Sequence, residues 1–512
     1  MFSCVSKVDM KDRTVGVVHL AAGKAFAGLT LFNQGVETFL IDEDGRAINT
    51  WRSKRTVFAS YLLPNGHLVR DGNDSDLATT FNAGGAAGYI EEVTWENELV
   101  WSFAALPYSR YLTHHDIEPM PNGHVLVLLW ERRTKEECIR AGRKSEFLPD
   151  DEVWDQMVWE LAPNGRGGAD VVWQWSLFDH LVQDADPSKE NFGQIHAHPE
   201  LFDINACPPG GKLGCRNQGL VGPRGRLSDT APDSADKITG FCQPRSSFGA
   251  TGTGEKDWSH CNGLCYDAHR DQIIQSFNIH SEILIIDHST TTDEARGHSG
   301  GRYGRGGDFL FRWGNPSNYR CGTRTDQMLY NQHSCRLGRV NESGFSTSVL
   351  VFNNGRVPDR HWSSVDELEL PEEVPGSGIY TLPAPGMAFG PEKFTWSYGP
   401  RVGRLGSFYC THISCCERLD NGNTLVVQGP QGIITEVTPS GEEVWRYVVP
   451  VSSGSKAKAV CITRQGDERV LPSDLSFTLF QVKKYPLSYA PFVERGITPE
   501  HRRRCFYLEA YP

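Results

Sequence analysis

A hairpin motif that recurs along the chain limits what this sequence can fold into more than any other feature. Apolar segments enter and leave an Asn-Gly turn in LLPNGHLV (62–69), PMPNGHVLVL (119–128) and RLDNGNTLVV (418–427). Asn and Gly most readily take the two positive-φ positions of a type I′ turn, so we expect tight hairpins of that type. Less regular versions occur at 266–277 and 349–355. Hairpins of one kind, spread over the chain, indicate a repeated β unit.

A tryptophan within a short β-rich run marks the same unit. The six are Trp51, Trp101, Trp173, Trp313, Trp396 and Trp445, separated by 50, 72, 140, 83 and 49 residues. The shortest intervals match the roughly 40–50 residues of one propeller blade. We therefore predict an all-β fold, a six-bladed β-propeller whose first and last strands close the ring and remove free sheet edges. A large β-sandwich or two β domains would not require one hairpin to recur at this spacing.

The domain boundaries follow from this repeat. Residues 26–490 are assigned to the propeller, with 1–25 as an N-terminal extension and 491–512 as a C-terminal tail. The longest Trp interval contains an insertion at 207–254 that is rich in Gly, Pro and Ser, and we expect a long surface loop there. This loop contains three of the fourteen cysteines, Cys207, Cys215 and Cys242, and a disulfide between two of them would be a reasonable way to constrain it.

Charge and hydropathy exclude several classes of function. The chain has 51 Lys and Arg against 63 Asp and Glu, a formal net charge of −12, which argues against a nucleic-acid partner because phosphate binding needs a basic surface. No apolar stretch reaches the roughly 18 residues of a membrane-spanning helix, so no membrane span is expected. The N-terminal segment lacks the clean apolar core of a signal peptide, which makes a cytoplasmic location the default expectation. Helical periodicity is scarce, with 134–147 as the best candidate.

Three of the seventeen histidines share a place in the repeat. His115, His260 and His333 each open a strand that follows a Trp-bearing strand and precedes a hairpin. The first strand of a blade lines the central channel, so matched positions on different blades face one another. We therefore expect these three imidazoles, far apart in the chain, to meet at one end of the channel. His412 lies two residues further from the Gly of its own Asn-Gly turn than His115 does from Gly123, and it is expected to reach the same end.

The segments that carry these histidines resemble the arylsulfate sulfotransferase family, which uses an aryl sulfate donor and no nucleotide. The likeness is most specific in DWSHCNGLCYDAHRDQIIQSFNIHSEILIIDHST and in GGDFLFRWGNP, which NQHS follows. It implies a six-bladed propeller in which His333 takes the sulfuryl group as a nucleophile and His115 and His260 support it. The partners implied are small molecules, an aryl sulfate and a phenol, and no cofactor is implied.

One position departs from the family pattern. The family has an Arg eighteen residues after the second histidine, and here that position is Asn278. An Arg would clamp sulfonate oxygens through two hydrogen bonds, whereas Asn donates without charge. Either protonated His115 and His260 supply the charge, or the donor differs, or the chemistry has changed. Asn278 is still expected to bind substrate, and the other candidates are His412, Asp116 and Asn262. Stacking on an aryl ring is expected of Trp258, Tyr330 or Tyr409.

Two other interpretations of the histidines stay open. His115, His260 and His333 could instead bind a divalent metal ion in the channel, with His412 or Asp116 as a further ligand. The chain could also be a non-catalytic propeller that binds a ligand or a protein on one face. Outside the channel, the Gly-rich and Arg-rich segment at 297–308 is expected to be a mobile loop rather than a phosphate site, because it does not join a strand to a helix.

Overall fold

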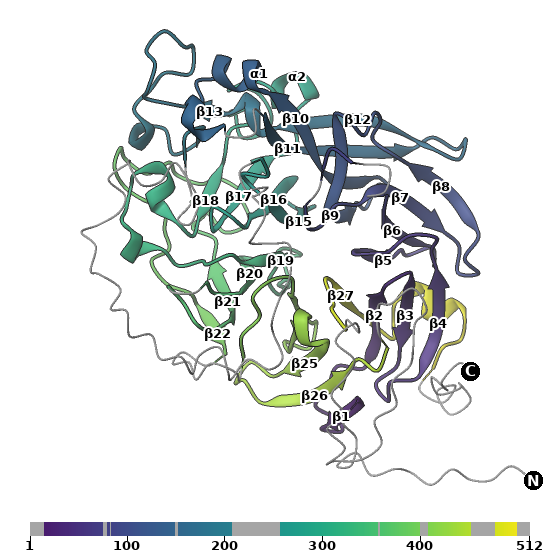
Figure 1. Ribbon diagram of the computed structural model, residues 1–512. Coiled ribbons are helices and arrows are strands. Elements are labelled where there is room, and N and C mark those ends of the chain that lie inside the picture. The colour runs from purple at the N-terminus through teal and green to yellow at the C-terminus, as the bar shows by residue number, and fades with distance from the viewer. Residues whose placement is uncertain are drawn as a thin grey trace, which may run out of the picture.

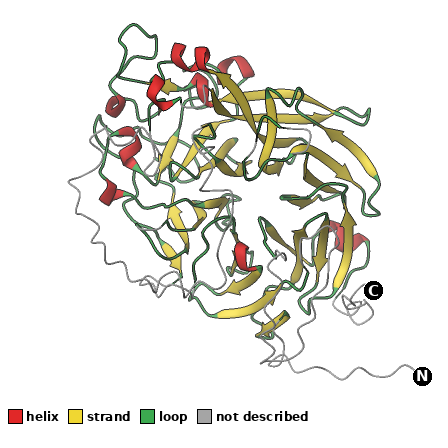
Figure 2. Ribbon diagram, in the orientation of Figure 1, coloured by secondary structure: helices red, strands yellow, loops and turns green. Residues whose placement is uncertain are grey.

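The structure is a computed structural model that describes residues 15–74, 79–81, 83–148, 152–206, 256–356, 359–399, 408–451 and 477–498. Six antiparallel sheets stand around one central channel, as Figure 1 shows. The six-bladed β-propeller predicted from the hairpin and Trp repeats is confirmed. Strands dominate the described chain, and its helices are few and short (Figure 2). The insertion at 207–254, with its expected disulfide, lies outside the described residues.

The strands of each blade follow one another from the channel outward. Blade one contains β27 (Val482–Pro486), β2 (Gly28–Gln34), β3 (Glu37–Ile41) and β4 (Ala47–Arg52). Blade two contains β5 (Ser60–Leu62), β6 (Leu68–Asn73), β7 (Gly88–Val93) and β8 (Leu99–Phe103). Blade three contains β9 (Tyr111–Pro119), β10 (Val125–Thr134), β11 (Glu152–Pro163) and β12 (Ala169–Ser176).

The second half of the ring is built in the same way. Blade four contains β15 (Cys261–Asp267), β16 (Gln272–Phe277), β17 (Glu282–Asp287) and β18 (Phe311–Trp313). Blade five contains β19 (His333–Leu337), β20 (Ser348–Asn353), β21 (Ser364–Glu369) and β22 (Trp396–Tyr398). Blade six has five strands: β23 (Cys415–Arg418), β24 (Thr424–Gln428), β25 (Ile433–Val437), β26 (Glu443–Val448) and β1 (Gly16–Leu20).

Strands from both ends of the described chain close the ring. β27 pairs with β2 and is the innermost strand of blade one, although it follows blade six in the sequence. β1 pairs with β26 and is the outermost strand of blade six, although it precedes blade one. The expected closure by first and last strands is therefore found. It also takes Gly16–Leu20 into the propeller, although the sequence analysis placed this segment in the extension 1–25.

The repeated Asn-Gly hairpins are tight, but they are not of type I′. In the first turn only the glycine takes a positive φ, 83° at Gly66, and its N–H donates to Leu63 O at 2.9 Å. This is a type I turn followed by a left-handed residue, and Pro64 favours it because its fixed φ suits the second position. The side chain of Asn65 accepts the N–H of His67 at 2.9 Å, which explains the Asn. The same contacts recur at Gly123 and Gly422.

The six marker tryptophans lie one to a blade, on the strands β4, β8, β12, β18, β22 and β26. In five of them the indole N–H donates to a group of the next blade. Trp51 donates to Thr94 O of blade two at 3.0 Å, and Trp445 donates to Glu43 O at 2.9 Å and so joins blade six to blade one. Trp101 differs, because it donates to Glu92 within its own blade. The intervals between the six tryptophans therefore predicted the number of blades correctly.

Apolar side chains gather between the blades rather than in one centre. Six large clusters of buried residues lie one between each pair of neighbouring blades, including blades six and one. A blade packed on both faces needs strands that are apolar on both faces, and Glu282–Asp287 (EILIID) is an example that is buried along its length. The sheets are therefore fixed against one another, and the channel between their inner strands has a defined shape.

Short helices and one small strand pair lie outside the blades. The helix expected within 134–147 is α1 (Lys135–Arg140), which begins with a capping box between Thr134 and Glu137. The other α-helices are α2 (Thr292–Ala295) and α3 (Ala490–Glu494), and β13 (Leu181–Val182) and β14 (Phe202–Asp203) form a parallel pair. In the described part of the chain, no helix has both the length and the apolar character needed to cross a membrane.

Candidate functional site

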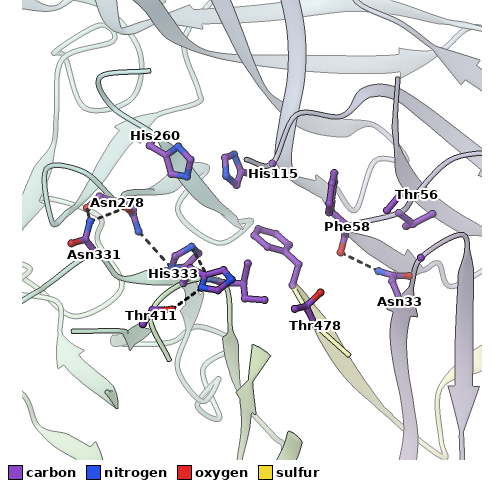
Figure 3. Close-up of a pocket in the computed structure, with 16 residues that line it drawn as sticks. Asn33, Thr56, Phe58, His115, His260, Asn278, Asn331, His333, Thr411 and Thr478 are labelled. Carbon is purple, nitrogen blue, oxygen red and sulfur yellow. Dashed lines mark hydrogen bonds between the residues drawn. The ribbon is translucent and has the colours of Figure 1, made fainter. Parts of the chain in front are cut away.

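A cavity of about 430 Å³ lies at the end of the channel where the innermost strands begin. Its wall carries His115, His260, His333 and His412, which come from blades three to six in turn. The rings of His115 and His260 meet edge to face, with 4.5 Å between their centroids, and Figure 3 shows both beside His333. The structure thus brings together the four histidines that the sequence analysis expected to meet.

The backbone is bent where these histidines leave their strands. His115 and His260 hold φ values of 56° and 44°, in a region that costs a non-glycine residue about 1–3 kcal/mol. Strand pairing also shifts register beside His115, His260 and His333. Such bulges re-aim side chains, and strain of this kind clusters at functional sites. The bends explain how side chains on channel-lining strands come to face one cavity at the strand ends.

The contacts of His333 settle which of its nitrogens carries the proton. Nδ1 lies 2.8 Å from Oδ1 of Asn354. The amide of Asn354 can face only this way, because its nitrogen donates to the carbonyls of Cys410 and Ile413 at 2.9 and 3.0 Å. Nδ1 of His333 is therefore the donor, and Nε2 keeps a lone pair that accepts the N–H of Ile413 at 3.0 Å. Burial lowers the pKa of His333 to about 3, so the ring is neutral at pH 7.

His260 is held by a buried carboxylate that the sequence analysis missed. Oδ2 of Asp257 lies 2.5 Å from Nδ1 of His260, and the carboxylate also accepts the N–H of His260 at 3.2 Å. The pair leaves Nε2 as the nitrogen available to a ligand. The spacing in DWSH was the available clue, because Asp257 stands three residues before the histidine.

His115 and His412 are uncharged members of the cavity wall. Burial, with repulsion from His260, His114 and His333, lowers the pKa of His115 well below its usual value. Burial also lowers the pKa of His412, whose Nδ1 lies 2.8 Å from the hydroxyl of Thr411. The lowered pKa of His115 argues against a positive charge on this ring, and among these four histidines His260 has the anionic partner.

Asn278 lies on the cavity wall but is engaged by the protein. Its amide nitrogen donates to Gln332 O at 3.0 Å and lies 3.5 Å from Nδ1 of His333, while its oxygen accepts from Asn331 at 3.0 Å. The described residues that line the cavity include no Lys or Arg. An anion in this cavity would therefore be held by neutral donors and by His260.

Two expected substrate-binding residues lie elsewhere. Asp116 points into a polar network deeper in the channel, where its carboxylate accepts from Arg336 and Gln481, both at 3.1 Å. Asn262 is buried between strands and bonds to Gln332 O and Ser276 at 3.0 and 2.9 Å. Asp116 directly follows His115, and alternation along a strand turns neighbours to opposite sides. Asn262 lies two residues after His260, and the shift in register between Cys261 and Gly263 changes the side that it faces. Neither residue lines the cavity.

The aromatic wall of the cavity also differs from expectation. Phe58 and Phe480 line it, 6.5 Å apart between ring centroids and edge to face, and Phe480 lies 5.9 Å from the ring of His115. Trp258 instead packs among buried residues of blades three and four, and the described lining does not include Tyr330 or Tyr409. Phe480 could have been found from its place just before a channel-lining strand, as with the histidines, had β27 been located.

The three channel histidines are not arranged as a metal centre. Among the residues that the structure describes, the group that brings three potential ligand atoms within 4.8 Å of one another is His180, His298 and Asp308. His115, His260 and His333 do not form such a group, so the donor geometry gives no support to a metal shared by the three. The chemistry open to this cavity is nucleophilic and acid–base chemistry by imidazoles.

Comparisons with known proteins identify a family. A family model described as Arylsulfotransferase (ASST) matches residues 28–469. A search of curated proteins finds no match.

Solved structures that resemble this chain do so distantly. A protein of unknown function from Bacteroides caccae has a TM-score of 0.40 and 9% identity, covering 82% of this chain and 93% of that chain. A putative 6-phosphogluconolactonase from Bacteroides fragilis has a TM-score of 0.35 and 9% identity, covering 91% and 99%. A periplasmic gluconolactonase from Pseudomonas aeruginosa has a TM-score of 0.35 and 10% identity, covering 89% and 98%. We draw nothing about function from these likenesses.

Proposed function

The chain belongs to the arylsulfotransferase family, and from this premise we propose that it moves a sulfuryl group from an aryl sulfate to a phenol through His333. The observation that supports the proposal most is the tautomer of His333. Asn354 holds the proton on Nδ1, so Nε2 keeps the lone pair that a nucleophile needs. Because the pKa of His333 is lowered to about 3, protonation does not compete with attack at neutral pH.

The first half-reaction uses two histidines. Nε2 of His333 forms a bond to sulfur as the bond from sulfur to the aryl oxygen breaks, and the aryl oxygen leaves with that electron pair. His260, whose Nδ1 is held by Asp257, acts as the general acid and donates a proton from Nε2 to the leaving oxygen. The products are a phenol and an N-sulfohistidine at His333.

The second half-reaction runs in the reverse direction with another phenol. The acceptor gives its proton to Nε2 of His260 as its oxygen attacks sulfur. The bond from sulfur to nitrogen breaks, and His333 recovers its lone pair. Donor and acceptor use one cavity in turn, so ping-pong kinetics follow.

The backbone N–H of Ile413 must move away from Nε2 of His333 before this nitrogen can attack sulfur. It occupies the lone pair of Nε2 at 3.0 Å in the structure. Ile413 and Ser414 both hold positive φ values, 47° and 85°, so release of backbone strain offsets part of the cost of movement. Once displaced, the same N–H is placed to donate to a sulfonate oxygen, the role of an oxyanion donor.

The shape of the cavity supports an aryl substrate. Phe58 lies across the cavity from Asn278 and His333, as Figure 3 shows, and Phe480 lies beside Phe58 and adds to this apolar side. Aromatic rings favour offset or edge-to-face contact with such side chains. A planar ring with one anionic group fits this division, with the ring toward the phenylalanines and the sulfate toward the histidines.

The test is to incubate the protein with 4-nitrophenyl sulfate, with and without an added phenol. We expect a sulfuryl adduct on the peptide that contains His333 with donor alone, and its disappearance when phenol is added. His333→Ala should abolish adduct and transfer, whereas His67→Ala, which alters a hairpin histidine outside the cavity, should keep both. Full transfer by His333→Ala, or an adduct on another residue, would contradict the proposal, as would donor binding without any turnover by the unchanged protein.

A further inference from the structure

Away from the channel, two histidines and one aspartate converge between blades three and four. His180 follows β12, and His298 and Asp308 lie at the two ends of the Gly-rich loop between β17 and β18. Nδ1 of His180 and Nδ1 of His298 each lie 2.8 Å from the same atom, Oδ1 of Asp308. From this geometry we propose a zinc site formed by His180, His298 and Asp308, which fastens the loop 297–308 to blade three.

The surroundings of His180 prepare it as a metal ligand. Its Nε2 lies 2.9 Å from Ala295 O, and because a carbonyl oxygen can only accept, Nε2 carries the proton. With that proton on Nε2, Nδ1 is the nitrogen that faces Asp308 and is left to bind a metal ion. A histidine that donates its second nitrogen to a carbonyl is the usual outer-shell arrangement of a metal-bound imidazole.

The loop is built to bring its two ends together. Gly306 N donates to Gly300 O and Gly307 N donates to Gly297 O, both at 3.1 Å, so the loop folds back on itself. Gly307 has to be a glycine, because a Cβ there would lie 2.1 Å from Ala295 O and 2.5 Å from Nε2 of His180. The loop that the sequence analysis expected to be mobile is closed by these contacts.

Trp175 fixes the ring of His180 from the other side. The two rings stack with an interplanar angle of 4° and 5.6 Å between centroids, and the indole N–H donates to Gly307 O at 2.8 Å. The ligand from blade three and the ligands from the loop are thus held by one scaffold.

The donor set selects the metal. Two imidazole nitrogens and one carboxylate oxygen suit Zn²⁺, which takes four ligands in a tetrahedron. His180 is buried whereas the side chain of His298 is 61% exposed, so the fourth position faces solvent and is filled by water. The site does not depend on the proposed sulfuryl transfer.

The experiment uses the untagged full chain, treated with a chelator and then dialysed with or without Zn²⁺. We expect about one bound zinc per chain and a rise of several degrees in the unfolding temperature, because a ligand that binds only the folded state stabilises it. His298→Ala and Asp308→Asn should lose both effects. His298 is exposed, so its variant is expected to fold.

Two further variants make the result specific. His67→Ala also breaks a pairing of one histidine with one carboxylate, Glu92, at 2.6 Å, and should keep the zinc and the temperature rise. His333→Ala should keep them too, which separates this site from the channel. Failure of the unchanged protein to take up zinc would overturn the proposal, and so would zinc uptake that survives in His298→Ala and Asp308→Asn or is lost in His333→Ala.

Discussion

Among single residues, Asn354 has the largest influence on what His333 can do. It is fully buried, and the two carbonyls that hold its amide nitrogen leave only its oxygen to face the imidazole. A carboxylate at this place would attract a second proton to the ring, whereas an amide oxygen accepts one proton without adding charge. The neutral ring of His333 is therefore a consequence of its burial, and the amide of Asn354 determines which nitrogen keeps the proton.

The first prediction concerns the pH dependence of attack by His333. With saturating 4-nitrophenyl sulfate, the burst of released phenol should be nearly constant between about pH 5 and pH 8, because the pKa of His333 is lowered to about 3 by burial. A histidine of ordinary pKa would lose about 30-fold over this range as it becomes protonated. Rapid-quench measurement of the burst checks this. In Asn354→Asp the burst should decrease as the pH falls toward 5, because the carboxylate favours protonation of His333. A burst that stays independent of pH in that variant would contradict the role given to Asn354.

The second prediction concerns Asp257 as a positioning residue for His260. Asp257→Asn should slow transfer from phenyl sulfate by about 100-fold or more, since general acid catalysis contributes at least that much when the leaving oxygen needs a proton. Transfer from 4-nitrophenyl sulfate should fall far less, because its phenolate leaves unaided. The measurement is kcat over a series of donors, with Asp257→Glu as the conservative control. Equal losses for all donors would show that Asp257 only supports the fold.

At this scale the sequence allowed the histidines to be predicted but not their partners. His115, His260 and His333 recur at similar places in the blades, so the repeat brings them together. Asn354 reaches His333 from the loop after β20, and Phe480 reaches the cavity from the segment before the closing strand, and both positions depend on the assembled ring. Asp116 was misplaced because it directly follows His115, and alternation along a strand turns the two side chains to opposite sides.

Among the elements, the outer strands carry the contacts that join one blade to the next. Their tryptophans could be predicted as blade markers because a bulky indole at one repeated position can bridge to the next blade. The turn type could not be predicted from Asn-Gly alone. In all three hairpins the Asn keeps a negative φ and accepts the N–H two residues on, whether the residue before it is Pro64 or Asp420. The repeat of the sequence therefore predicted the number of blades better than the local geometry of any hairpin.

The third prediction tests these indole contacts with a matched pair. Trp445 and Trp396 each donate to a carbonyl of the next blade, at 2.9 and 2.8 Å, but Trp445 is fully buried and Trp396 is partly exposed. Trp445→Phe should lower the free energy of unfolding by about 1–3 kcal/mol, because it leaves the carbonyl oxygen of Glu43, which is shielded from water, without a hydrogen-bond donor. Trp396→Phe should cost less than about 1 kcal/mol, since water replaces the lost donor. Urea unfolding checks the order, and a larger loss in Trp396→Phe would refute it.

At the scale of the whole molecule, charged and polar side chains inside the channel also join the blades to one another. Arg336 of blade five donates to Glu118 and Asp116 of blade three and to Tyr61 of blade two, at 2.8, 3.1 and 2.7 Å. Gln481, beside blade one, donates to Tyr61 as well. This network fills the channel beneath the cavity and links side chains from blades on opposite sides of the ring.

The fourth prediction concerns pH and the junction of blades three and four. Burial opposes protonation of His288, but hydrogen bonds to Asp271 and Glu160 outweigh it and raise the pKa of His288 to about 9. A raised pKa means that this stabilisation is fully present below about pH 6.5, the ordinary value, and is lost as the pH rises through 9. The unfolding temperature should fall over that window. His288→Gln should flatten the fall, and the exposed His269→Gln should not; the reverse pattern would contradict the assignment.

The place of β27 in the chain determines when the cavity comes into being during synthesis. A ribosome makes blades two to six while blade one still lacks its innermost strand, because Val482–Pro486 is made after blade six. Thr478 and Phe480, which belong to the cavity wall, precede that strand directly. A nascent chain therefore contains all four histidines before it has a complete pocket. Substrate can bind only after the residues that form the last strand have left the exit tunnel.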